Sequence, residues 1–205
     1  MESDYRVRGD AISDGKPAAL LSLSYDHPSG FYVNGSVIGS LDHENDSVLL
    51  GGIGNIGYAR RIAPRISIDA GYARTQYSHY GAPVHHDAHY DEFYAGIFAH
   101  GLSAQVYVSP DYLERGFSTF YGELNAAIRP ANKWRLTGHI GVLRYLSEPR
   151  YLSLPARYDW RIGAARQIGR FDLHVALTGS GPGIDRYWDH RYHRTAVIGG
   201  VIWSF

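Results

Sequence analysis

The chain has 205 residues, balances 20 basic against 20 acidic side chains, and contains no cysteine. This length and the absence of a linker predict a single domain over residues 1–205, and the missing cysteine excludes a disulfide framework, a thiolate metal site and a cysteine nucleophile. A formal net charge of zero argues against a nucleic-acid partner.

The chain starts without a basic and then apolar leader, and no apolar run approaches the roughly 18 residues of a transmembrane helix. If the protein is exported, we expect this sequence to be the mature form, with Met1 in place of a removed leader. The 24 glycines and 17 tyrosines, with proline mostly at turns, are typical of a β protein. A membrane location would therefore require a β-barrel.

Apolar and polar residues alternate with a period of two along nearly the whole chain, as in RISIDAGY, FYGELNAAI, WRLTGHIGV and FDLHVALT. This pattern predicts strands that each have one apolar face. The expected strands, in chain order, are 2–12, 17–27, 31–41, 48–62, 65–78, 91–100, 103–112, 117–129, 134–147, 157–168, 171–180 and 193–205.

The connections between these strands alternate in length. Tight turns are expected at 27–30, 63–64, 101–102, 130–133 and 169–170, and longer loops at 42–47, 79–90, 149–156 and 181–192, with the short connection at 13–16 as an exception. Short turns at one end, longer loops at the other and an even strand count are typical of outer-membrane barrels. We predict an all-β fold, an antiparallel up-and-down transmembrane β-barrel of about twelve strands, with short periplasmic turns and longer extracellular loops.

A soluble sandwich would show the same alternation, because its two sheets bury their apolar faces against each other. Aromatic residues favour the membrane barrel, since they lie near strand ends on the apolar face, where interfacial girdles are found. These aromatic residues are Tyr5, Tyr25, Phe31, Tyr58, Trp134, Phe171 and Trp203.

Several longer motifs resemble the TorF family of porins. The opening SDYRVRG, followed by DGKPA and SGFY, is similar to the start of that family, and DEFYAGIF, QVYVSPDYLERG and DWRIGAARQIGRFDLHVALT resemble its later strands in the same order. The resemblance covers essentially the whole chain. It implies a bacterial outer-membrane β-barrel that acts as a channel, and it implies no particular solute.

The polar face of the expected strands supplies candidate pore-lining residues. Twelve strands imply a barrel about 24 Å across, with a lumen of roughly 12 Å after side chains are added. The lining would select small polar solutes or close the lumen by its own ion pairs. The candidate residues are Arg6, Arg8, Asp69, Glu92, Glu123, Arg135, His139, Arg161, Asp172 and His174.

The expected loop at 79–90 is rich in histidine, and His85, His86 and His89 are weak candidates for binding a transition metal. No ordered ligand spacing is present, so we interpret this segment as a solvated loop and predict neither a metal nor another cofactor. A lipid hydrolase is a further alternative, but no G-x-S-x-G motif occurs. We therefore predict that the protein is not an enzyme.

The chain ends in AVIGGVIWSF, with Val197, Val201, Trp203 and Phe205 on one face. This pattern predicts a signal for the outer-membrane barrel assembly machinery, and the same face would meet outer-membrane lipids and lipopolysaccharide. The predicted function is passive diffusion of small polar solutes across the outer membrane. The alternative is a closed-lumen barrel that serves as a binding or scaffold protein through its His/Tyr-rich extracellular loops.

Overall fold

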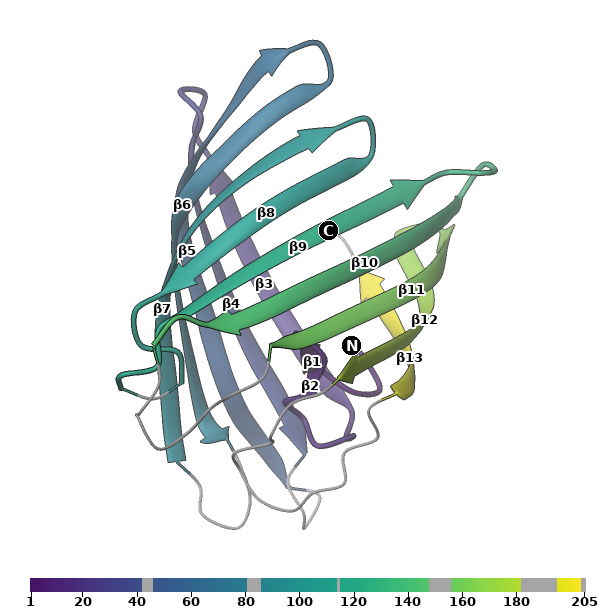
Figure 1. The fold of residues 1–205 in the computed structure, drawn as a ribbon. Coiled ribbons are helices and arrows are strands. Elements are labelled where there is room, and N and C mark those ends of the chain that lie inside the picture. Colours follow the sequence, from purple (N-terminus) through teal and green to yellow (C-terminus); the bar gives the residue numbers. More distant parts are fainter. Residues whose placement is uncertain (42–45, 81–85, 114, 148–155, 182–194, 204–205) are drawn as a thin grey trace.

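The computed structural model describes residues 1–41, 46–80, 86–113, 115–147, 156–181 and 195–203, apart from the side chains of residues 79, 80, 86 and 87 (Figure 1). Strands dominate these ranges, which contain no helix. Within them, accordingly, no helix is long and apolar enough to cross a membrane.

An 11-stranded sheet forms the wall, and each strand pairs with its neighbours in sequence. Every pairing is antiparallel, so the chain runs up and down around the wall. The wall strands are β3 (Ala18–Asp26), β4 (Phe31–Leu41), β5 (Ser47–Ala63), β6 (Ile66–Tyr80), β7 (His86–Ala99), β8 (Leu102–Ser109), β9 (Thr119–Ile128), β10 (Trp134–Tyr145), β11 (Arg157–Ile168), β12 (Phe171–Gly181) and β13 (Thr195–Trp203). The predicted fold class is confirmed.

Residues 1–3 close the ring between β3 and β13. Glu2 forms antiparallel bridges to Ala18 on one side and to Gly200 on the other. Backbone hydrogen bonds link the amide of Glu2 to the Ala18 carbonyl and the amide of Ser3 to the Gly199 carbonyl, both at 2.8 Å. Residues 1–3 thus bridge the first and last strands of the sheet, at Ala18 of β3 and at Gly199 to Val201 of β13.

The predicted strand over residues 2–12 is wrong, because the chain leaves the wall after Ser3 and enters the barrel. There it forms a small hairpin from β1 (Arg6–Val7) and β2 (Asp10–Ala11). The two-residue turn has positive φ at both positions, 51° at Arg8 and 82° at Gly9, as a type I′ turn requires. We call residues 4–12 the luminal hairpin; Figure 1 shows β1 and β2 within the ring of strands.

The five tight turns form within one residue of their predicted positions, at the upper end of the barrel in Figure 1. The β7–β8 turn is another two-residue connection, with φ of 52° at His100 and 84° at Gly101. The expected histidine-rich loop is shorter than predicted, since β6 extends to Tyr80 and β7 begins at His86. Cross-strand pairing continues beyond Tyr77, through a register shift, and this pairing carries both strands into the expected loop.

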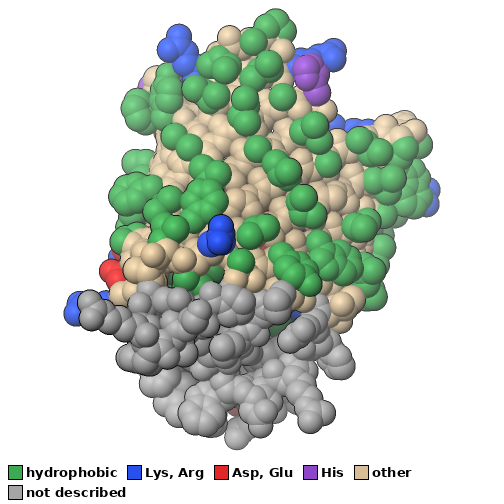
Figure 2. Space-filling view, viewed as in Figure 1, with side chains coloured by type: hydrophobic (Ala, Val, Ile, Leu, Met, Phe, Trp, Pro, Cys, Tyr) green, Lys and Arg blue, Asp and Glu red, His purple; other side chains and the backbone are tan. Residues whose placement is uncertain are grey.

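The outer wall is apolar. Leu23, Val37, Ile140 and Ile162 are each more than half exposed, and Figure 2 shows hydrophobic side chains spread over the visible face of the wall. An apolar surface of this extent requires an apolar surrounding, as lipid provides. The expected aromatic residues Tyr25, Phe31, Tyr58, Trp134, Phe171 and Trp203 are exposed near the tight-turn end. Tyr5 is the exception: it lies in the luminal hairpin and packs against buried aromatic residues.

Candidate functional site: a polar chamber inside the barrel

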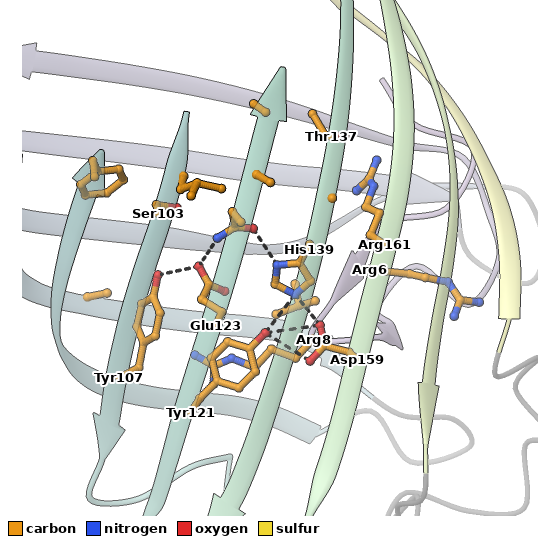
Figure 3. Close-up of a pocket in the computed structure, with 18 of the residues that line it drawn as sticks. Arg6, Arg8, Ser103, Tyr107, Tyr121, Glu123, Thr137, His139, Asp159 and Arg161 are labelled. Atoms are coloured by element: carbon orange, nitrogen blue, oxygen red, sulfur yellow. Dashed lines mark hydrogen bonds and ion pairs between the residues drawn. The ribbon is translucent and has the colours of Figure 1, made fainter. Parts of the chain in front are cut away.

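A chamber of about 880 Å³ occupies the barrel interior. Its lining begins with Arg65, His100 and Gly101 in the tight turns and ends at Tyr5 and Arg8 of the luminal hairpin. The chamber therefore extends from the tight-turn end to the hairpin. Figure 3 shows that its charged and aromatic side chains project from neighbouring strands toward a common space.

The strand register builds one wall of the chamber from two cross-strand rows. Ser103 pairs with Asn125, Asn125 with His139, and His139 with Arg161, so four adjacent strands direct a polar side chain inward at one level. The neighbouring row lies two residues along each strand, toward the loops. Its members are Gln105, Glu123, Gly141, Asp159 and Ser180.

His139 lies at the centre of a hydrogen-bond network in this wall (Figure 3). Its Nε2 lies 2.7 Å from Oδ1 of Asp159, and its Nδ1 lies 2.7 Å from Oδ1 of Asn125. The Tyr121 hydroxyl lies 3.2 Å from Nε2 of His139 and donates to Asp159. Asn125 also donates to Glu123 at 3.1 Å. These contacts fix the orientation of each side chain, so the polar wall is preorganised.

Gly141 makes room for this network. A Cβ at Gly141 would lie 2.1 Å from the Tyr121 hydroxyl oxygen and 2.7 Å from Oδ2 of Asp159. The phenol of Tyr121 therefore occupies the space that a side chain would fill on the neighbouring strand.

The tip of the luminal hairpin is tied to the opposite part of the wall. Nη2 of Arg8 donates to both carboxylate oxygens of Glu92, at 2.7 and 2.8 Å. The Arg8 guanidinium carbon also lies 4.2 Å from the ring centroid of Tyr121, 5.3 Å from that of Tyr112 and 5.4 Å from that of Tyr107. Both partners of the ion pair are nearly buried, with side-chain exposures of 10% for Arg8 and 7% for Glu92. Burial of this kind makes the pair hard to break.

A second ion pair ties the hairpin to β11, where Arg157 donates to Asp10. Within the hairpin, Nε of Arg6 donates to Asp4 at 2.6 Å, and Nη1 donates to the Gly9 carbonyl at 3.2 Å. Three contacts therefore hold the hairpin: the ion pair of Arg8 at its tip, the ion pair of Asp10 with β11, and the hydrogen bond from Arg6 to its own turn.

Beyond the hairpin, toward the loops, side chains fill the barrel. A buried cluster contains Ile38, Leu50, Tyr77, Tyr90, Tyr112, Tyr121 and Leu143. Tyr5 and Ile12 of the hairpin pack against it. Burial is the main reason why the pKa of Tyr112 is raised. Burial also raises the pKa of Tyr5 to about 12. Both phenols therefore stay protonated at neutral pH. In this structure the chamber is open to the tight-turn end and narrowed by the hairpin and this cluster.

The structure brings six of the ten predicted lining residues to the chamber. These six are Arg6, Arg8, Glu92, Glu123, His139 and Arg161. The other four lie outside its lining.

Each of those four residues has a partner in the structure. Asp69 accepts from the Tyr32 hydroxyl at 2.8 Å, Arg135 pairs with Asp172 at 2.6 Å, and His174 lies 3.1 Å from Glu2. They hold the barrel wall and the closing segment together.

Sequence reasoning missed Asp159, Tyr121, Asn125 and Arg157 as site residues. Asp159 and Arg157 share the alternation that pointed to Arg161, so the pattern of β11 could have identified them. Nothing local could have identified the tie between Arg8 and Glu92, which are 84 residues apart.

Some of the residues considered for the metal and enzyme alternatives lie in the described ranges. His85 and the side chain of His86 lie outside them, His89 is exposed in β7, and no group of three metal-ligating side chains occurs in the described part of the chain. His139 contacts Asp159, Asn125 and Tyr121, and no serine or threonine hydroxyl bonds to it in the described ranges.

The last strand presents the expected outward face as far as Trp203. Val197, Val201 and Trp203 are exposed on the outer wall, whereas Phe205 lies outside the described residues.

Two solved porin structures share this fold. The KdgM porin aligns with a TM-score of 0.58 at 13% identity, over 92% of each chain. The NanC porin aligns with a TM-score of 0.62 at 8% identity, over 92% of this chain and 93% of that one. No curated protein matches in sequence. Residues 1–188 match the model of a family described as a bacterial protein of unknown function, Gcw_chp. The resemblance to the TorF family remains a prediction.

Proposed function

The chain belongs to the Gcw_chp family of bacterial proteins of unknown function, and we propose that it forms a porin-like channel of the bacterial outer membrane for passive diffusion of small hydrophilic solutes. The observation that carries this proposal is a closed barrel with an apolar outer wall around a polar chamber of about 880 Å³. Lipid would meet the wall, and small solutes would enter the chamber.

The partners follow from the same arrangement. Outer-membrane lipids and lipopolysaccharide would surround the exposed apolar side chains, and the barrel assembly machinery would bind the last strand, including Phe205. The solutes would be small and polar, since ion pairs and hydroxyls line the chamber. Passive diffusion requires no chemical step and no cofactor.

The luminal hairpin narrows the path, so conduction requires residues 4–12 to shift or leave. Residues 5–15 can be replaced by two glycines while Met1 to Ser3, which close the ring, are kept. In planar bilayers we expect the shortened protein to conduct ions more strongly than the full chain. A barrel that is folded and heat-modifiable, yet conducts neither with nor without the hairpin, would contradict the proposal.

The second candidate is a closed barrel that binds partners through its extracellular loops. The filled interior beyond the hairpin favours it, because this packing needs no further ligand to be stable. Deletion of residues 81–85, which lie between β6 and β7, distinguishes the two candidates. A binding protein would lose its partner while still folding, whereas a channel without its hairpin would still conduct after the deletion.

A further inference from the structure

Arg8 fills a cage that the barrel builds from three elements. Glu92 of β7 supplies a carboxylate that accepts two hydrogen bonds, and Tyr107 of β8 and Tyr121 of β9 supply aromatic rings. Tyr112, in the connection between β8 and β9, adds a third ring. A carboxylate combined with aromatic faces suits a planar guanidinium, which donates hydrogen bonds in its plane and stacks on rings.

The walls of the cage hold one another in place without help from Arg8. The ring centroids of Tyr90 and Tyr112 lie 4.7 Å apart, and those of Tyr107 and Tyr121 lie 5.9 Å apart. Tyr121 is further fixed by its hydrogen bonds to Asp159. The cage should therefore persist when the hairpin leaves.

Departure of the hairpin would leave Glu92 without its cation at the wall of the chamber. The residue is only 5% exposed, and in the described ranges its ion pair is with Arg8. A carboxylate flanked by aromatic rings attracts a cation, so the empty cage would favour another cation. Glu123, which lines the same chamber, adds a second negative charge.

The hairpin also covers a positive charge on another strand. Asp10, which lies two residues after Arg8 in the chain, pairs with Arg157 of β11. Departure of the hairpin would therefore expose an acidic, aromatic cage on β7 to β9 and a guanidinium on β11. This pair of charges is complementary to a small solute that carries a guanidinium and a carboxylate.

We propose that the cage around Arg8 is a solute subsite of the barrel, that it binds the guanidinium of a small zwitterionic solute, and that Arg8 is its built-in occupant. The inference rests on the proposed channel and names the class of solute that this channel recognises. Free arginine is the probe, and citrulline is its control, because citrulline has nearly the same shape but a neutral ureido group.

The test uses the barrel in which two glycines replace residues 5–15. Arginine should block its ionic current in planar bilayers at a concentration about tenfold or more below that needed for citrulline, because a charged hydrogen bond is lost in citrulline. Glu92→Gln in this background should weaken the block by arginine about tenfold. Asp91→Asn is the matched control and should leave the block unchanged, since Asp91 pairs with Arg74 and not with Arg8.

Conduction without preference for arginine over citrulline would overturn this inference while leaving the channel intact. If no variant conducts, the channel proposal fails. Calorimetry with arginine in detergent then tests whether the cage binds a guanidinium. Arg8→Ala, which empties the cage but keeps the hairpin backbone, serves if the shortened chain does not fold. Arginine binding to it that exceeds citrulline binding supports the subsite, and equal or absent binding overturns it.

Discussion

The ion pair between Arg8 and Glu92 should control how tightly the luminal hairpin is docked. Arg8→Met or Glu92→Gln each leaves the other group unpaired in a nearly buried place, with side-chain exposures of 10% and 7% in the native pair. Loss of one partner of a buried pair costs about 3–5 kcal/mol. Even about 3 kcal/mol corresponds to roughly a hundredfold shift in the docking equilibrium.

Hydrogen exchange measures docking directly and independently of conduction. The amide of Ile12 donates to the Tyr5 carbonyl, and the amide of Tyr5 donates to Ser13 Oγ, both at 2.8 Å. These amides are protected only while the hairpin is formed, so each single variant should accelerate their exchange by roughly a hundredfold in detergent micelles. The combined variant should accelerate exchange by less than the two single effects together, because it leaves no charge unpaired.

Arg74→Met is the control, because Arg74 and Asp91 form the same kind of pair with exposures of 49% and 34%. An exposed pair contributes about 0–1 kcal/mol, so hairpin exchange should not change. Unchanged protection in Arg8→Met and Glu92→Gln, or effects that add fully in the combined variant, would refute the interpretation of the pair as a latch.

Three further outcomes are expected. Arg161→Glu should raise the cation-to-anion permeability ratio roughly fifteenfold in reversal-potential measurements, because a double charge change about 10 Å from an ion amounts to about 0.8 kcal/mol in water, favourable for a cation and unfavourable for an anion. An unchanged ratio would mean that Arg161 does not face the conducting path. Gly141→Val should displace Tyr121 and lower the free energy of unfolding, measured in urea, by about 1–3 kcal/mol. Gly138→Ala is the control and should have little effect, because a Cβ at Gly138 meets nothing within 4 Å. Removal of Phe205 should reduce barrel assembly in cells more than refolding in detergent, and equal effects on both would argue against its role in assembly.

The sequence by itself determined the wall of the barrel. Alternation with a period of two separates the outward face, which meets lipid, from the inward face, because successive side chains of a strand point to opposite sides of the sheet. The expected strand 171–180 differs by one residue from β12, Phe171–Gly181. Inward placement of Glu123, His139 and Arg161 follows from the same pattern.

Only the tertiary structure decided what fills the barrel. Residues 2–12 alternate as a wall strand would, yet Arg8 and Gly9 take positive φ and turn the chain back. This turn is stabilised by contacts of Arg8 with residues that are remote in sequence, namely Glu92, Tyr107, Tyr112 and Tyr121. Local periodicity carries no information about such partners, because it reports the face of a residue and not the group that the face meets. Packing across the barrel therefore determines the hairpin. It also determines the chamber that the hairpin limits at one end and the cage that Arg8 occupies.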